Sequence, residues 1–343
     1  MVNGAPGSAW ASVRVVRAGA EEQRMLAGAP SAHDAGPLRP DHLFDLASLT
    51  KVFTTVAALR FVEQGLIDLD APVSEIAAVG SGSDAARVTL RHLLTHSSGL
   101  PPECWLWRDG LLGDELRAAA LRTELRAVPG EEHCYSDVGF IAVGEILERA
   151  SGRSLEEIVA EVAVALGADS LTWRPEQERA VATEEQPHRG LIRGEVHDEL
   201  AHALARPSGH AGLFGSADDV AALARMVRDD GDGPRSRVLT SASVRLMSAP
   251  VIRAEAGYGQ AIGLRVRDRS WMGEVDAVGH TGFTGTCFAV DRDSGGFGVL
   301  LLNRVHPTRE GTDVSLIRRD FLRPIGSDGG ESIRTTAGSE TET

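Results

Sequence analysis

Lysine is almost absent from this chain of 343 residues. Lysine and arginine together number 35, and every one of them is arginine except Lys51. Arginine keeps its proton in proteins, whereas a desolvated lysine can lose its proton and act as a base. The single lysine is therefore a candidate for a chemical role, and the alternative is a chance survivor of a preference for arginine.

Other features are scarce too, and each absence disfavours a class of protein. No run approaches the roughly 20 apolar residues of a membrane span, and the first residues lack the basic and apolar regions of a secretory signal. The formal net charge of -14 disfavours binding to nucleic acid or to anionic lipid. We therefore expect a cytoplasmic protein that binds neither nucleic acid nor membranes.

Cysteine is rare, and its pattern does not favour a metal site. Cys104, Cys134 and Cys287 are odd in number and far apart, so neither a disulfide framework nor a zinc ribbon fits, and we predict buried or free thiols. His197 and His202 suggest a zinc-protease helix, but a spacing of five misaligns them for one metal. We predict no metal and no cofactor.

The remaining composition is that of a folded globular protein, with 42% hydrophobic and 24% charged residues. The length predicts two lobes or one large composite domain. Strands are predicted at 11–17, 258–266, 286–291 and 297–303. Helices are predicted at 49–65, 89–95, 111–127, 136–150, 155–166, 216–228, 240–248 and 312–323. Strands at both ends predict a sheet closed by the two termini.

This order of elements predicts a discontinuous sheet domain with an insertion. The sheet domain comprises residues 1–62 and 249–325, and a mainly helical domain with long loops comprises residues 63–248. Little periodicity is visible between 170 and 215, which favours a structured loop region near a site. The polar residues 326–343 are predicted to be a disordered tail.

Ser48 and Lys51 lie three residues apart where a helix is predicted to begin, so their side chains share one face. A serine hydroxyl is a weak nucleophile unless a base takes its proton, and a lysine can supply that base. The start of the helix adds N–H groups that can stabilise an oxyanion. Alone the motif is weak, because an N-cap serine followed by a surface lysine gives the same pattern.

Four segments occur in this order along the chain: Phe44–Lys51, His92–Pro101, Tyr135-Ser136-Asp137 and Gly279-His280-Thr281-Gly282. Together they resemble the serine β-lactamase-related family, which includes class C β-lactamases, penicillin-binding-protein-like peptidases, family VIII esterases and acyltransferases. Residues 194–198, 209–214 and 301–308 resemble its esterase-like branch. The resemblance implies an α/β (α+β) fold of the β-lactamase/transpeptidase type, an antiparallel sheet flanked by helices plus a helical lobe.

The resemblance also implies roles for three catalytic residues. Ser48 matches the nucleophile that forms an acyl-enzyme, and Lys51 matches its hydrogen-bonded activator. Tyr135 matches the tyrosine that shares the base role and protonates the leaving group. A core tyrosine with a bonded hydroxyl is the alternative for Tyr135.

Supporting roles follow from the segment at 279–283. His280 stands where the family has lysine or histidine followed by Thr281 and Gly282, and it can donate to the tyrosine or to a substrate carboxyl. Gly282 would let a substrate approach the strand closely. The backbone N–H of Phe283, together with that of Ser48, is the expected oxyanion hole.

Asp137 departs from the asparagine that is usual in classical β-lactamases and peptidases. An aspartate would pair with Lys51 and raise its pKa, which favours Tyr135 as the working base and argues against amide substrates. A histidine at position 280 also makes recognition of a carboxylate-bearing lactam less assured than a lysine would.

The leading prediction is an esterase or biosynthetic transesterase that acts on a small-molecule ester or thioester, with an acyl acceptor as a further partner in the second case. The alternatives are a β-lactamase or D-stereospecific peptidase, and an inactive binding protein on the same fold.

Overall fold

The computed structural model describes residues 8–34, 36–310 and 313–326. Its strands are β1 (Ala9–Val15), β2 (Gln23–Gly28), β3 (Phe44–Asp45), β4 (Glu185–Gln186), β5 (Gly190–Leu191), β6 (Phe214–Gly215), β7 (Ile252–Arg253), β8 (Gly259–Gln260), β9 (Arg265–Val266), β10 (Val278–Thr281), β11 (Cys287–Asp291) and β12 (Gly296–Leu302). Its helices are α1 (Thr50–Glu63), α2 (Leu90–Leu94), α3 (Gly113–Leu121), α4 (Asp137–Ser151), α5 (Leu155–Leu166), α6 (Glu199–Leu204), α7 (Ala217–Arg228), α8 (Ser241–Ser248), α9 (Arg269–Met272) and α10 (Ser315–Leu322). The predicted tail lies outside the described residues, apart from Gly326.

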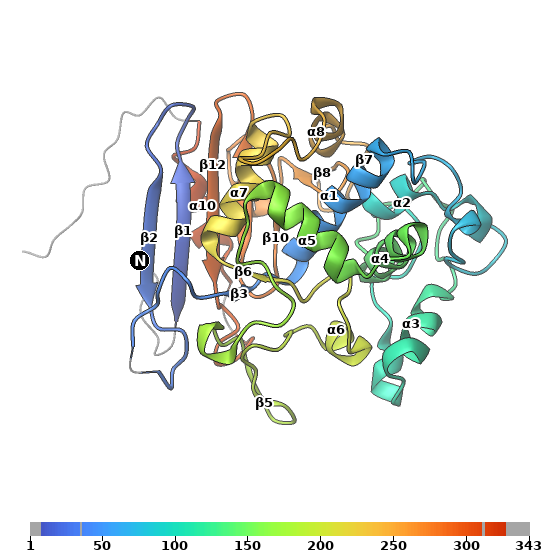
Figure 1. Ribbon diagram of the computed structural model, residues 1–343, viewed down its shortest axis with the longest axis horizontal. Helices are drawn as coiled ribbons and strands as arrows, with labels where there is room; N and C mark the ends of the chain where they lie inside the picture. The colour runs from blue at the N-terminus through green and yellow to red at the C-terminus, as the bar shows by residue number, and fades with distance from the viewer. Residues whose placement is uncertain (1–7, 35, 311–312, 327–343) are drawn as a thin grey trace, which may run out of the picture.

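The central feature is an eight-stranded sheet in the order β2-β1-β12-β11-β10-β9-β8-β7. Each neighbouring pair is antiparallel. β1 pairs with β12 from Trp10 opposite Leu302 to Val15 opposite Phe297, so the two ends of the chain close one sheet as predicted. Figure 1 shows the blue strand β1 beside the red strand β12.

The two faces of β12 belong to two hydrophobic cores. Phe297, Val299 and Leu301 join the large core that includes α1 and α7. Leu300 and Leu302 point the other way, into a smaller core with α9 and α10. A strand covered on both faces reads as a continuous apolar run, which explains the sequence Gly-Phe-Gly-Val-Leu-Leu-Leu.

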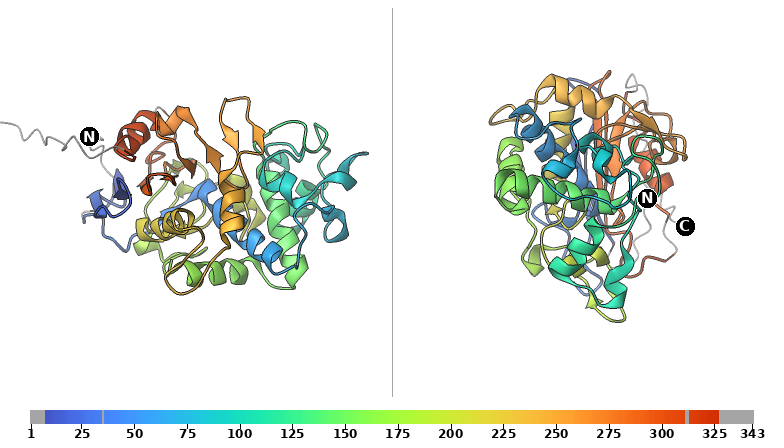
Figure 2. Two further views of the ribbon diagram at one scale, coloured as in Figure 1. Left: turned by 90° about the horizontal axis from the view of Figure 1, so that it is seen from above. Right: turned by 90° about the vertical axis from the view of Figure 1, so that its right-hand side faces the viewer.

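Helix α1 lies at the centre of the molecule, because nearly every one of its residues is buried. It packs against α4 and α5, and α7 packs against β12, β11 and β1. Figure 2 shows the cyan and teal helices, labelled α2 and α3 in Figure 1, at the end of the molecule away from β2. The division into two domains at residues 62 and 249 stays a prediction.

Several elements differ from the prediction for identifiable reasons. β2 was not predicted, because all six of its residues are exposed and give no alternation. The helix predicted at 111–127 ends at Leu121, because the chain then pairs with another segment through a bridge between Ser81 and Glu124. All three cysteines are free thiols, as predicted. None of the described helices is long and apolar enough to cross a membrane.

Candidate active site

Ser48 lies in a tight turn that the preceding residues hold in place. The short strand β3 ends at Asp45, whose Oδ1 accepts a hydrogen bond of 2.8 Å from the backbone N–H of Ala47. Ala47 has a φ of 46°, in the left-handed region that costs a residue with a Cβ free energy. A 3-10 turn over Ala47–Leu49 then leads into α1. The alternative of an N-cap serine is therefore excluded, because Leu49 holds the N-cap position and Ser48 lies inside the turn.

Lys51 lies in the first turn of α1 with only 1% of its surface exposed. Its Nζ is 3.0 Å from Ser48 Oγ and 2.9 Å from the backbone oxygen of His210, and it donates to both. The same nitrogen lies 2.7 Å from Asp137 Oδ1, so the predicted pairing with Asp137 is present. The alternative of a surface lysine is excluded.

Burial opposes the charged form of Lys51, but the interactions of its ammonium group with Asp137 and Tyr135 more than offset this, and the pKa of Lys51 is raised. The ammonium group therefore keeps its proton at neutral pH. The raised pKa disfavours a neutral Lys51 as the base, and the role of Lys51 as activator of Ser48 stays a prediction. Lys51 acts as a buried positive charge beside the serine hydroxyl.

Tyr135 directly precedes α4, whose N-cap Ser136 accepts a hydrogen bond from the N–H of Gly139. Two cations lie near the Tyr135 ring: Lys51 Nζ is 5.0 Å from its centroid, and the Arg265 guanidinium carbon is 5.4 Å away. These positive charges can offset negative charge that a reacting phenol carries. Arg265 is 130 residues distant in sequence and was not predicted.

His96 is a second residue that the prediction missed. Its ring stacks on Tyr135 with centroids 4.3 Å apart, and its Nδ1 accepts from the backbone N–H of Ser136 at 3.0 Å. Burial lowers its pKa well below the usual value, and the charge of Lys51 adds to this, so His96 is a neutral platform for Tyr135. The segment His92–Pro101 contributed to the family resemblance, but the resemblance gave His96 no role.

His280 is buried, with 1% of its surface exposed, and it is absent from the walls of both pockets that contain Ser48. Its Nδ1 lies 2.9 Å from the backbone oxygen of Thr281. Burial lowers its pKa well below the usual value, and the charges of Arg265 and Lys51 lower it further. The expectation that His280 binds a substrate carboxyl is therefore unsupported. Its ring packs 6.1 Å from that of Tyr135 instead.

Beyond His280, β10 ends at Thr281, which lines a pocket together with Gly282 and Phe283. A Cβ on Gly282 would lie 2.1 Å from Thr286 Oγ1 and 2.6 Å from the backbone oxygen of Leu46. Position 282 therefore needs glycine because the protein itself packs closely there. The prediction gave a different reason, that Gly282 lets a substrate approach the strand. Within the described residues, the backbone N–H groups of Ser48 and Phe283 donate no hydrogen bond, which suits the predicted oxyanion hole.

Two pockets meet at Ser48 and Tyr135, and Phe283 lines both. The larger, about 740 Å³, carries the side chains of Arg265, Arg304, Arg309 and Arg318 in its wall. The smaller, about 300 Å³, is lined by two tryptophans and by four carboxylates, those of Glu103, Asp137, Asp198 and Glu199. Ser48 therefore lies between a pocket rich in arginine and a pocket rich in carboxylates and tryptophan.

Asp137, Asp198 and His210 bring ligand atoms within 4.8 Å of one another, the spacing of a metal site. Lys51 already places its ammonium 2.7 Å from Asp137, and His210 Nε2 lies 3.0 Å from Asp198 Oδ1. These hydrogen bonds engage the group, and a buried ammonium repels a metal ion. The side chains of His197 and His202 bond to different partners, Glu184 and Arg189, so they do not converge on one metal.

The geometry agrees with comparisons to known proteins. A model of the beta-lactamase family matches residues 4–322, so the chain belongs to the beta-lactamase family. The N-acetylmuramyl-L-alanine amidase of Bacillus subtilis (strain 168) is 29% identical over 77% of this chain and 68% of that protein. Esterase EstB of Burkholderia gladioli is 32% identical over 62% of this chain and 64% of that protein. The structure described as EstCE1, a hydrolase with promiscuous acyltransferase activity, is 24% identical with a TM-score of 0.75, over 92% of this chain and 93% of that chain.

The resemblance inferred from the sequence and the β-lactamase/transpeptidase-like fold are thereby confirmed. The chain is a hydrolase of the serine β-lactamase family.

Proposed function

We propose that the protein is a serine esterase or transesterase that forms an acyl-enzyme on Ser48 from a small ester or thioester. The observation that carries this proposal is the buried Lys51, which donates to Ser48 Oγ at 3.0 Å while Asp137 holds its charge. A lysine with a purely structural role has no reason to be buried against a partly exposed serine at the junction of two pockets.

In this mechanism Tyr135 takes the proton of Ser48, and Ser48 Oγ attacks the substrate carbonyl carbon. The backbone N–H groups of Ser48 and Phe283 receive the oxyanion. Tyr135 then returns the proton to the leaving oxygen or sulfur, and the acyl group remains on Ser48. Water, or an acceptor hydroxyl or amine, releases the acyl group in the second half of the cycle.

Amide hydrolysis, including β-lactamase or D-stereospecific peptidase activity, is the second candidate. It is favoured by the similarity to an N-acetylmuramyl-L-alanine amidase and by the basic pocket, which suits a carboxylate-bearing substrate. Asp137 argues for esters, because an aspartate ion-paired with Lys51 has no N–H to donate to the acyl amide of a substrate.

Labelling with a fluorophosphonate probe tests the enzyme proposal. Wild type should react at Ser48, Ser48→Ala should not, and Ser83→Ala, an exposed serine outside both pockets, should react like wild type. An unlabelled wild type, or equal labelling of Ser48→Ala, would favour the inactive binding protein.

Turnover of p-nitrophenyl esters, p-nitroanilides and nitrocefin then distinguishes the reactions. Nitrocefin or anilide hydrolysis comparable to ester hydrolysis would overturn the ester preference. Transfer is supported if an added alcohol or amine captures the acyl group, and it is rejected if free acid is always the sole product.

A further inference from the structure

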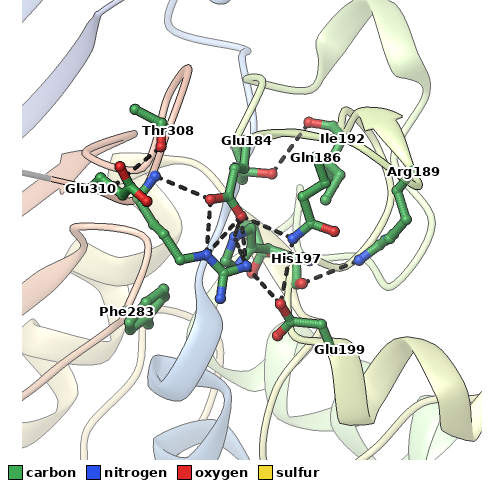
Figure 3. Close-up of polar contacts among 12 residues, drawn as sticks. Glu184, Gln186, Arg189, Ile192, His197, Glu199, Phe283, Thr308 and Glu310 are labelled. Atoms are coloured by element: carbon green, nitrogen blue, oxygen red, sulfur yellow. Dashed lines mark hydrogen bonds and ion pairs between the residues drawn. The ribbon is translucent and has the colours of Figure 1, made fainter. Parts of the chain in front are cut away.

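Phe283 forms the wall between the two pockets, and polar side chains hold its ring. Phe283 is 48% exposed. The imidazole of His197 stacks on it at 5.7 Å with an interplanar angle of 22°, and Figure 3 shows the two residues in the same cluster. The guanidinium carbons of Arg304 and Arg309 lie 4.5 and 5.7 Å from its centroid. Cations and one imidazole, rather than an apolar core, therefore surround the ring of the residue whose backbone N–H is the second donor of the proposed oxyanion hole.

Arg309 is itself held by a buried carboxylate. Its Nε lies 2.8 and 2.9 Å from the two oxygens of Glu184, its Nη2 lies 2.6 Å from Glu184 Oε2, and its backbone N–H donates to Glu184 Oε1 at 3.0 Å. The same Nη2 lies 2.6 Å from Glu199. Figure 3 shows Glu184, Gln186, His197 and Glu199 converging on this point. The contact joins the turn after β12 to a segment 125 residues earlier in the chain.

Glu184 has a side chain only 6% exposed, so its charge depends on these bonds. Burial raises the pKa of its carboxyl, but the hydrogen bonds from Arg309, Gln186 and His197 more than offset this and lower the pKa. A charged carboxylate left without its arginine would be an uncompensated buried ion, and the segment would have to rearrange.

His197 links this cluster to the nucleophile. Its Nε2 lies 2.8 Å from Glu184 Oε2, which fixes the ring that stacks on Phe283. Its backbone N–H donates to Asp45 Oδ2 at 2.7 Å, and Asp45 Oδ1 accepts from the N–H of Ala47, the strained residue before the nucleophile. One network therefore reaches both donors of the proposed oxyanion hole, Phe283 by ring stacking and Ser48 through Asp45.

We propose that Arg309 and Glu184 are positioning residues for the oxyanion hole, acting through His197 on Phe283 and on the turn at Ser48. The inference rests on the proposed function. Loss of one oxyanion donor costs about 10²–10³ in kcat, so a donor that is displaced rather than removed should cost about tenfold.

The test compares Arg309→Lys, Arg309→Ala and Glu184→Gln with wild type on a small neutral ester and on its thionoester, in which sulfur replaces the carbonyl oxygen. Both Arg309→Ala and Glu184→Gln should lower kcat about tenfold with little change in KM, and Arg309→Lys should recover part of the loss because lysine keeps the charge without the planar fork. The ratio of ester to thionoester kcat/KM should fall too, because a loosened hole discriminates less against sulfur.

The matched control is Arg235→Ala, which breaks another two-pronged arginine pair, with Asp169, outside both pockets. It should leave kcat and the ratio unchanged. Wild-type kcat in Glu184→Gln, or a loss of kcat with an unchanged ratio, would overturn the positioning role. If Arg309→Ala does not fold, Arg309→Lys and Glu184→Gln decide the question. An inactive wild type would refute the proposed function instead.

Discussion

Replacing Asp137 with asparagine tests the electrostatic core of the site. The change keeps the shape of the side chain and removes the charge that lies 2.7 Å from Lys51 Nζ. Lys51 is almost completely buried, so its ammonium would lose its ionic partner and keep only hydrogen bonds. Breaking one side of a buried pair costs about 3–5 kcal/mol, and we expect a loss toward the lower end of this range because these hydrogen bonds remain.

The pH at which the loss is visible follows from the pKa of Lys51, which is raised in the folded protein. A raised pKa stabilises the fold fully at any pH below the unfolded value of about 10.4, and the contribution is lost only as the pH rises through the folded pKa. The difference between wild type and Asp137→Asn should therefore be constant between about pH 6 and 9 and should shrink in more alkaline solution.

Urea unfolding at several pH values measures this difference. The control is Asp169→Asn, which removes the charge from an exposed pair with Arg235 and should cost at most about 1 kcal/mol. The amide of asparagine can also donate to a substrate acyl amide, so nitrocefin turnover relative to ester turnover should rise in Asp137→Asn. Unchanged stability together with an unchanged substrate ratio would refute the role assigned to the pair.

Three further predictions concern the same pockets. Lys51→Arg should fold, but stopped-flow burst measurements should show acylation about 10²-fold slower, because a planar guanidinium cannot reproduce the contacts of the ammonium. Near-normal acylation would show that only the charge of residue 51 matters. Tyr135→Phe should lower kcat about 10²–10⁴-fold, because the group that carries the proton is lost. Labelling by the fluorophosphonate should become slow but stay specific for Ser48. A decrease of only about twofold in kcat would exclude Tyr135 as the base. Arg318 is buried and lines the basic pocket, so wild type should prefer the anionic p-nitrophenyl hemisuccinate to the neutral p-nitrophenyl butyrate. Arg318→Gln should reduce that preference about tenfold. A preference that survives the substitution would place the anion elsewhere.

The sequence was most informative where local interactions decide the structure. The helix predicted at 155–166 has these bounds in the structure, because Ser154 and Glu157 form a capping box and Gly167 takes a left-handed φ of 70° at its end. The contact between Ser48 and Lys51 follows from their spacing of three residues. The pairing of Asp137 with Lys51 could be predicted because opposite charges at one site attract, once the family resemblance had placed them together.

The parts that were missed depend on contacts between distant segments. Nothing near Arg265 in the sequence indicates that its guanidinium lies beside Tyr135, because only the pairing of β9 with β10 brings it there. His280 could be assigned to the correct strand, but its burial depends on what packs over that strand. The sequence could not distinguish the turn at Ser48 from an ordinary helix cap, because the left-handed Ala47 is held by Asp45, whose carboxylate the distant His197 also binds.

The rarity of lysine correctly drew attention to Lys51. The explanation differs from the first one considered, which was that a desolvated lysine can lose its proton and act as a base. The pKa of Lys51 is raised, so easy loss of its proton does not account for a lysine at this position. The three oxygens around Nζ supply another reason. Nζ donates to Ser48 Oγ at 3.0 Å and to His210 O at 2.9 Å, and it forms an ion pair with Asp137 Oδ1 at 2.7 Å. A compact ammonium donates three hydrogen bonds from a single nitrogen, whereas a planar guanidinium spreads its donors over a fork. A chain that uses arginine wherever a cation suffices therefore needs its lysine where three acceptors must share one nitrogen.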